Sequence, residues 1–375
     1  MNYALVRKIA MAIFIVVVVL LVLFVGREIA VRFFDYQPPA ITESQQKKSS
    51  QVEFVQESGE KFYHTVTDSY IYFVNTDKVS ICDAEGNLKK EEGIVTSEPV
   101  VKRNGEYVVI GDIGRNNIYV FSGTELKNTV ETTKPIIDVS VNNSGYLVVI
   151  TEGDMHKCDV TVLDTKGKEQ FIWNSGNLFV LNASIADNNK NIIISTLDTS
   201  GGKMKSVLSF YNISNEKPIA TEAYENELIS AVSIHGTKAF CIGDSKTVIY
   251  RVSGEKINEI LYDGKTLTTF KTWNSKIVMA FSESALSGKR YNIETYNTSG
   301  KNVGTYETDY EIKYLDFLQD MVVVGRGGLI DVIDVSGREK RLIDPGVDIK
   351  SLSFMGKTSS AVGFTINGAY IIRLS

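Results

Sequence analysis

The sequence predicts an all-β protein, an eight-bladed β-propeller with a seven-bladed ring as the alternative, preceded by one N-terminal transmembrane helix. Three observations lead there. A three-strand pattern recurs eight times between residues 51 and 375, an unbroken apolar run comes before it, and the chain ends one strand short of a complete last repeat. With 43% hydrophobic and 23% charged residues, the 375-residue chain has a globular composition.

The charge balance of the repeat region argues against nucleic-acid binding. The chain has 40 basic and 45 acidic residues, of which six and three lie in the first 50, so residues 51–375 carry 34 basic and 42 acidic groups. A net charge of −8 repels a phosphate backbone. We therefore expect no nucleic-acid partner.

The apolar run extends from Ile9 to Val25, 17 residues that become 18 with Gly26. A helix of this length reaches about 27 Å, close to the hydrocarbon thickness of a bilayer. Arg7, Lys8 and Arg27 stand at its two ends, where long basic side chains reach the interface. Because no small-residue cleavage site follows the run, it is predicted to be an uncleaved signal anchor rather than a secretion signal.

Basic residues before the run place the N-terminus inside the cell and the large C-terminal part outside. The expected division is a short cytoplasmic tail (1–8), a transmembrane helix (9–26), a juxtamembrane segment and polar tether (27–50) and the propeller (51–375). The expected location is the cell membrane, with one span and an extracytoplasmic C-terminal domain.

Each repeat begins with two strands joined by a turn rich in Asn, Asp, Gly and Ser, the residues that favour tight hairpin turns. The eight pairs are predicted at 62–75, 99–112, 137–152, 182–196, 229–244, 267–282, 312–327 and 349–365.

A third strand follows each pair and ends in a polar turn. The turn residues are Asp83, Ser122, Asp164, Asn212, Arg251, Asn297, Asp334 and Arg373, spaced by about 41 residues on average. Seven repeats continue into a fourth strand, and four antiparallel strands at this period are typical of a propeller blade. The eighth repeat ends at Ser375, directly after its third strand. Residues 51–56, within the strand-like stretch SQVEFVQE, are predicted to supply the missing outer strand and close the ring.

The turn Asp-x-x-Gly-Lys, clearest in VTVLDTKGKEQFIW (160–173), is similar to repeats of quinoprotein-like propellers, which include the lipoprotein propeller of the outer-membrane assembly machinery. An N-terminal anchor followed by such a ring also resembles an uncharacterised propeller family of Gram-positive bacteria. These resemblances imply a fold and no activity. Quinoprotein repeats use Trp residues to brace the blades, whereas this chain has only Trp173 and Trp273.

Residues that could carry chemistry are few and scattered. The three histidines, His64, His156 and His235, show no metal-ligand spacing, and Cys82, Cys158 and Cys241 form no Cys-x-x-Cys pair. The series Asp187, Asn189 and Asn191 looks like a calcium loop but lacks its central Gly and closing Glu, which favours a plain turn. We therefore assign no catalytic, cofactor-binding or metal-binding residue, expect no cofactor, and lean against an enzyme.

Loop length is the feature that points to function. Second-to-third connections are about four residues in four of the repeats and nine in repeats three (151–159), four (198–206) and six (282–290). All of these lie on one face of a propeller, and extended loops on a rigid scaffold commonly bind partners. Candidate contact residues are Asp154, His156, Lys203, Lys205, Lys289 and Arg290. Neutral loop drift is an equally open interpretation.

The sequence thus predicts a membrane-anchored, extracytoplasmic, non-catalytic binding or scaffolding module with a protein partner in the cell envelope. Two alternatives stay open: a cofactor- or sugar-binding enzyme that uses the propeller channel, and a sensor of envelope ligands. The sequence does not identify a small-molecule ligand.

Overall fold

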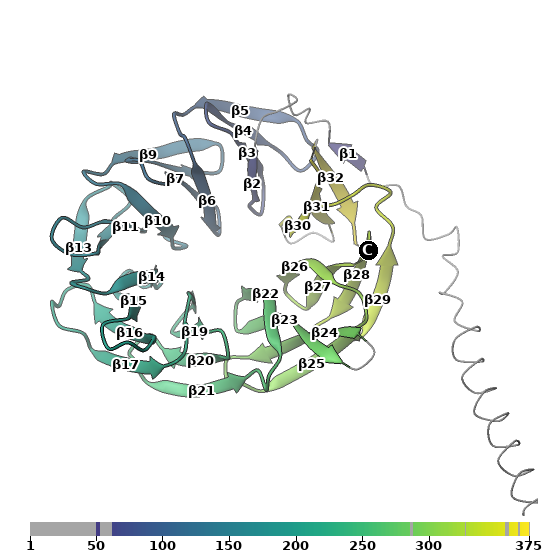
Figure 1. Cartoon of the computed structure of the whole chain (residues 1–375). Helices are drawn as coiled ribbons and strands as arrows, with labels where there is room; N and C mark the ends of the chain where they lie inside the picture. The colour runs from purple at the N-terminus through teal and green to yellow at the C-terminus, as the bar shows by residue number, and fades with distance from the viewer. Residues whose placement is uncertain are drawn as a thin grey trace, which may run out of the picture. The chain divides into compact units, whose positions relative to one another are not determined.

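The computed structural model describes residues 50–52, 62–285, 288–326, 328–356, 360–366 and 368–374, except for the side chains of 50–52, 284, 285, 288 and 289. These residues form eight four-stranded antiparallel sheets, which stand as blades around a ring (Figure 1). The eight-bladed propeller predicted from the sequence is confirmed. The predicted tail 1–8, the predicted helix 9–26 and the tether up to residue 49 lie outside the described residues. Within the described ones, no helix has the length and apolarity to span a membrane.

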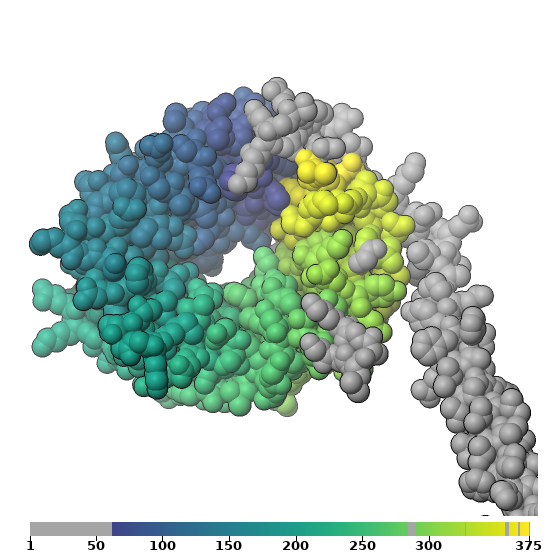
Figure 2. Space-filling view, in the orientation of Figure 1, coloured from purple at the N-terminus to yellow at the C-terminus, as the bar shows by residue number. Residues whose placement is uncertain are grey.

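The innermost strands line the centre of the ring in Figure 1. They are β2 (Tyr63–Val66), β6 (Pro99–Asn104), β10 (Ile136–Val141), β14 (Phe179–Ile185), β18 (Ala231–His235), β22 (Thr266–Trp273), β26 (Ile312–Leu318) and β30 (Ser351–Phe354). The space-filling view in Figure 2 shows that the ring is open at its centre.

The second and third strands of each blade are the most deeply buried. Second strands are β3 (Ile71–Val74), β7 (Tyr107–Asp112), β11 (Leu147–Glu152), β15 (Asn191–Asp198), β19 (Lys238–Ile242), β23 (Lys276–Ala285), β27 (Met321–Arg326) and β31 (Ser360–Phe364). Third strands are β4 (Lys78–Cys82), β8 (Asn117–Ser122), β12 (Cys158–Leu163), β16 (Lys205–Asn212), β20 (Lys246–Arg251), β24 (Gly288–Asn297), β28 (Leu329–Asp334) and β32 (Ala369–Arg373).

The outer strands form the rim, and where their side chains are described most of them are exposed or half-buried. They are β5 (Leu88–Gly93), β9 (Glu125–Glu131), β13 (Glu169–Asn174), β17 (Ala220–Glu225), β21 (Lys256–Leu261), β25 (Asn302–Thr308), β29 (Glu339–Ile343) and β1 (Ser50–Val52). Blades 1 to 7 thus run from β2–β5 to β26–β29, and blade 8 combines β30–β32 with β1.

The hydrophobic core lies between the blades. Runs such as Ile71–Val74 are buried along their whole length because a blade packs a neighbour on each of its two faces. The buried apolar side chains form eight clusters, one for each pair of adjacent blades. The cluster between blades 8 and 1 joins Val66 and Phe73 to Val362 and Phe364, so the packing continues around the ring.

The first and the last described strands meet in blade 8. Strand β1 pairs antiparallel with β32, with Gln51 opposite Tyr370 and Val52 opposite Ala369. Residues 51 and 52 of the predicted closing strand 51–56 therefore pair as its outer strand, and residues 53–56 lie outside the described residues. Beside this seam, His64 Nε2 forms a 2.7 Å hydrogen bond with Ser351 Oγ, and the His64 ring stacks on Phe364 at 3.7 Å between centroids.

Antiparallel order within every blade gives the ring two different faces. The first-to-second and third-to-fourth turns lie on one, which we call the turn face. The second-to-third connections and the blade-to-blade linkers lie on the other, which we call the connection face. A linker such as residues 94–98 crosses from the rim strand of one blade to the inner strand of the next.

Candidate functional site

The connection face contains the candidate contact residues that the structure describes. Asp154 and His156 lie in the blade 3 connection, residues 153–157, and Lys203 lies in the blade 4 connection, residues 199–204. Among the described residues they are the longest second-to-third connections, but they have five and six residues rather than the nine expected, because the flanking strands extend into the predicted loops. Asp154 and Lys203 are exposed and His156 is half-buried.

Blade 6 differs from the expectation of a nine-residue loop at 282–290. Most of that segment is strand, because β23 continues to Ala285 and β24 begins at Gly288. The ladder extends through Glu283, which pairs with Arg290. This extension is a projecting hairpin rather than a loop. Arg290 is exposed on it, and the side chain of Lys289 lies outside the described ones.

The candidate residues do not gather into one site. Lys205 begins β16 and forms a 3.1 Å ion pair with Asp198 of its own blade. Asp154 and His156 belong to a separate network in blade 3, and Arg290 stands on blade 6. The polar groups of this face are therefore local to each blade.

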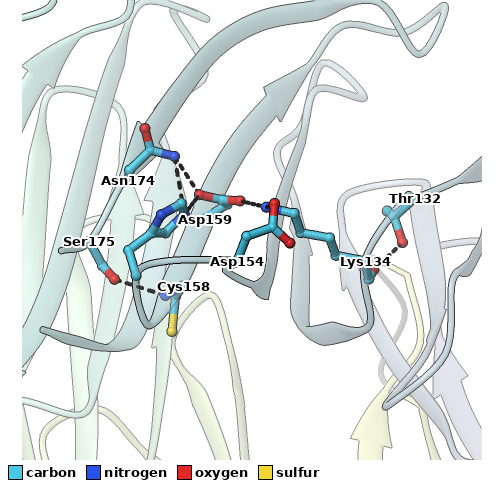
Figure 3. A network of polar contacts seen from close by, with 8 residues as sticks. Thr132, Lys134, Asp154, Cys158, Asp159, Asn174 and Ser175 are labelled. Carbon is cyan, nitrogen blue, oxygen red and sulfur yellow. Dashed lines mark hydrogen bonds and ion pairs between the residues drawn. The ribbon is translucent and has the colours of Figure 1, made fainter. Parts of the chain in front are cut away.

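The blade 3 network centres on a residue that the sequence did not single out, Asp159. The side chain of Asp159 is 7% exposed, and its Oδ2 accepts a 2.8 Å hydrogen bond from Lys134 Nζ. Lys134 Nζ also lies 3.0 Å from Asp154 Oδ2 (Figure 3). His156 Nε2 and the Asn174 amide both bond to Asp159 Oδ1. A loop, a linker and an outer strand are thus tied to one buried carboxylate.

The electrostatics of this network favour the ionised form of Asp159. Burial by itself raises the pKa of a carboxyl, but hydrogen bonds from Lys134, Asn174 and His156 outweigh it and hold the pKa of Asp159 below its ordinary value. The same contacts raise the pKa of Lys134. The ion pair and the hydrogen bonds to Asp159 therefore hold the base of the loop in place.

A signal for Asp159 existed in the sequence. It is a charged residue near the start of the apolar third strand CDVTVL, and a carboxylate at a buried position requires partners. The partners themselves were not predictable, because Lys134 comes from the preceding linker, 25 positions away.

The tip of the same loop is apolar and unprotected. Met155 is 98% exposed, above the fixed base of the network. Lys157 ends the same connection, and its Nζ lies 5.0 Å from the centre of the exposed Phe179 ring at the start of β14. The loop therefore presents an apolar side chain on a rigid support.

Exposed apolar side chains are unevenly divided between the two faces. Among the described residues ten large apolar side chains are exposed, and seven belong to the connection face: Val95, Ile137, Met155, Phe179, Leu261, Tyr310 and Ile366. Leu88 and Ile219 border the turn face, and Ile172 lies within β13. Exposed apolar side chains that concentrate on one surface indicate a contact surface.

An open cavity of about 470 Å³ lies where blade 1 meets blade 2. Residues at the start of β2 and β6 line it, together with Ile113 at the end of the second strand of blade 2. These strand ends belong to the connection face, near the centre of the ring.

The cysteine side chains are buried in the described part of the chain. The three cysteines are free and buried, and burial raises the pKa of the Cys82 thiol to about 11 and that of Cys241 further. Protonated thiols are poor nucleophiles. No group of three or more His, Cys, Asp or Glu side chains within metal-binding reach is found in the described part of the chain. Asp187 and Asn189 lie in the hairpin turn of blade 4, as the plain-turn interpretation expected.

Solved structures with the same architecture are numerous. BamB from Moraxella catarrhalis aligns with a TM-score of 0.52 at 12% identity, over 86% of this chain and 96% of that chain. The C-terminal WD40 domain of Sif2 aligns with a TM-score of 0.57 at 12% identity, over 86% and 99%. Hsv2 of Kluyveromyces lactis aligns with a TM-score of 0.50 at 10% identity, over 71% and 89%. At such identities these similarities show the propeller fold and nothing finer.

No curated protein matches the sequence. One family model does, and it covers residues 41–374, which include the whole described ring. The chain therefore belongs to the family described as "Family of unknown function (DUF5711)".

Proposed function

We propose that this protein is an extracytoplasmic, membrane-anchored binding or scaffolding propeller, non-catalytic, whose connection face receives a protein partner in the cell envelope. The observation that carries the proposal is the concentration of exposed apolar side chains on that face, with Met155 at 98% and Val95 at 73% exposure. A stiff disc with variable loops on one side binds a protein without any reactive group.

The mixed charge of the face favours a protein over a polyanion. Glu152 at the end of β11 and Asp154 and Lys157 in the blade 3 connection are all exposed, so the surface offers charges of both signs together with apolar groups. Protein–protein interfaces combine an apolar centre with a polar rim. The proposed contact residues are Asp154, His156, Lys203, Lys205, Lys289 and Arg290, with Met155 as the apolar anchor between the first two.

Membrane attachment and orientation are part of the proposal and rest on the sequence. The apolar run Ile9 to Val25 with its basic flanks supports a single span, and the basic N-terminus supports an external ring. The kinship with quinoprotein-like propellers is proposed on the Asp-x-x-Gly-Lys turn, and that with a Gram-positive propeller family on an N-terminal anchor followed by the ring.

Orientation is testable with one introduced thiol. The native cysteines are buried, so wild-type protein is expected to resist a membrane-impermeant maleimide. Met155→Cys places a thiol at the most exposed loop tip. We expect labelling in intact cells, before any permeabilisation. Labelling that requires permeabilised cells would place the ring inside and refute the location.

The partner surface is testable by photo-cross-linking in native membranes. A photo-reactive amino acid replaces Met155 on the connection face or, as the matched control, Leu88 beside the turn face, which is 57% exposed. We expect a discrete adduct from position 155 and none from position 88. Equal adducts from both positions, or none from either, would contradict a partner surface on the connection face.

A further inference from the structure

The cavity between blades 1 and 2 differs from the other contacts near the centre of the ring. Hydrogen bonds join inner strands at several other blade pairs: Lys102 Nζ lies 2.6 Å from Asp138 between blades 2 and 3, and Ser233 Oγ lies 2.6 Å from Thr272 Oγ1 between blades 5 and 6. Where β2 faces β6, an open space of about 470 Å³ occupies the corresponding region. This volume is within the range of about 300 to 1,000 Å³ that is typical of ligand pockets.

The walls of the cavity are mainly apolar and aromatic. They comprise Phe62, Tyr63, Pro99, Val100, Val101 and Ile113. Two ionisable groups complete the described lining, His64 and Glu98. Such walls suit the apolar part of a ligand, and a polar side chain of the protein at the edge of the cavity would fix the orientation of the ligand.

The two ionisable groups have different roles. His64 is already engaged by Ser351 and stacked on Phe364, and burial lowers its pKa to about 4, so its ring is neutral at pH 7. Glu98 is exposed at the start of β6, and its backbone N–H is held by Asp112 Oδ1 at 2.8 Å. The Glu98 carboxylate is thus the negative charge that the described lining offers to an occupant.

Apolar surface continues on both sides of the cavity. Val95, 73% exposed, lies in the linker that leads to Glu98. On the other side, Ile113 forms a parallel bridge with Ile136, and the exposed Ile137 follows it. Exposed apolar side chains of the same face thus lie close to lining residues, Val95 to Glu98 along the chain and Ile137 to Ile113 through the bridge.

We propose that this cavity binds an extended peptide segment of a partner protein, which inserts an apolar or aromatic side chain and pairs a neighbouring basic residue with Glu98. The proposal rests on the proposed function and specifies it, because it assigns the partner a linear motif of apolar and basic residues. The space accommodates one or two side chains rather than a folded surface, and the acidic edge selects a basic neighbour.

The test uses the full-length protein in detergent micelles and three pools of fluorescent six-residue peptides. Every pool has one aromatic position, followed by Lys, by Gln or by Glu. Fluorescence anisotropy is expected to show that the Lys pool binds about two- to fivefold more tightly than the Gln pool, the range of an exposed ion pair. Replacing the aromatic position with Gly is expected to weaken binding more than about tenfold.

Glu98→Lys is the critical variant. The Glu98 side chain is exposed, and the hydrogen bond to Asp112 is made by the Glu98 backbone N–H, so the substitution should leave the fold intact. We expect it to reverse the order, with the Glu pool now bound more tightly than the Lys pool. Glu225→Lys makes the same charge change at an exposed position at the end of β17, on the same face, and is expected to preserve the wild-type order. Val101→Phe, which enlarges a lining side chain on the side of β6 that faces blade 1, is expected to reduce binding of all pools.

The proposal is overturned if the aromatic and Gly peptides bind equally, or if Glu98→Lys keeps the wild-type order. Its failure is distinct from failure of the proposed function. Cross-linking at position 155 without selective peptide binding would retain a partner surface and reject this cavity. Selective peptide binding without cross-linking would retain the cavity and reject the loop surface.

Discussion

The polar side chains of the turn face and the exposed apolar side chains of the connection face have different roles. On the turn face the side chains mainly stabilise the backbone. Asp334 Oδ1 accepts hydrogen bonds from the backbone N–H groups of Ser336 (2.9 Å) and Arg338 (3.2 Å), and Asp83, Asp164 and Asn297 repeat this pattern in their own turns. On the connection face, lengths vary and apolar groups are exposed. The repeat motif therefore specifies the fold, and the irregular face remains available for binding.

Glycine substitutions should separate the faces most strongly. Gly337 has φ +84° on the turn face, and a Cβ there would lie 2.1 Å from the Thr305 carbonyl oxygen. Gly201, in the blade 4 connection, has open space around it. We expect Gly337→Ala to cost about 3 kcal/mol or more of folding free energy and Gly201→Ala less than about 0.5 kcal/mol, measured by chemical denaturation. Similar losses for both would remove the distinction between the faces.

The ring seam beneath both faces should be sensitive to acid. Burial lowers the pKa of His64 to about 4 from its ordinary 6.5, so the unfolded chain binds the proton more tightly than the folded ring. This contribution is complete above pH 6.5 and is lost as the pH falls from 6.5 to 4, by up to about 3 kcal/mol. Denaturation midpoints across that range measure it. His64→Gln should remove this part of the slope, and an unchanged slope would refute the assignment.

Within the connection face, the base and the tip of the blade 3 loop should respond differently. Asp159→Asn removes the buried charge that holds Lys134 and His156, and we expect a loss of about 1 to 2 kcal/mol. Asp154→Asn alters a carboxylate that is 80% exposed and should cost less than about 0.5 kcal/mol. Denaturation of both variants tests this order. An equal effect would mean that Asp159 does not anchor the loop.

Substitutions of exposed apolar side chains should change the folding free energy least, although Met155→Ser should weaken partner binding. Met155→Ser and Leu88→Ser should each change stability by less than about 0.5 kcal/mol, because both side chains are exposed. Only Met155→Ser should reduce recovery of the partner that position 155 cross-links. Reduced recovery with Leu88→Ser as well would contradict a one-sided contact surface.

Local and non-local features differed in how well they could be predicted. The blades were predictable because hairpin turns such as Asp164 to Lys168 and buried strands such as Ile192 to Ile194 carry local signals. The Asp159 network and the cavity were not, because each depends on side-chain contacts between separate segments: the linker, loop and outer strand around Asp159, and the two adjacent blades around the cavity. The blade 6 hairpin was mistaken for a loop because SESALSGKR has no apolar alternation, although the backbone ladder continues through it.

Carbene footprinting of the protein in native membranes, compared with the purified chain, tests the central claim most directly. The account predicts that labelling in membranes falls at Val95, Met155 and Leu261 and stays unchanged at Leu88 and Ile219. Unchanged labelling at all five positions, or protection of the turn-face pair, would contradict it.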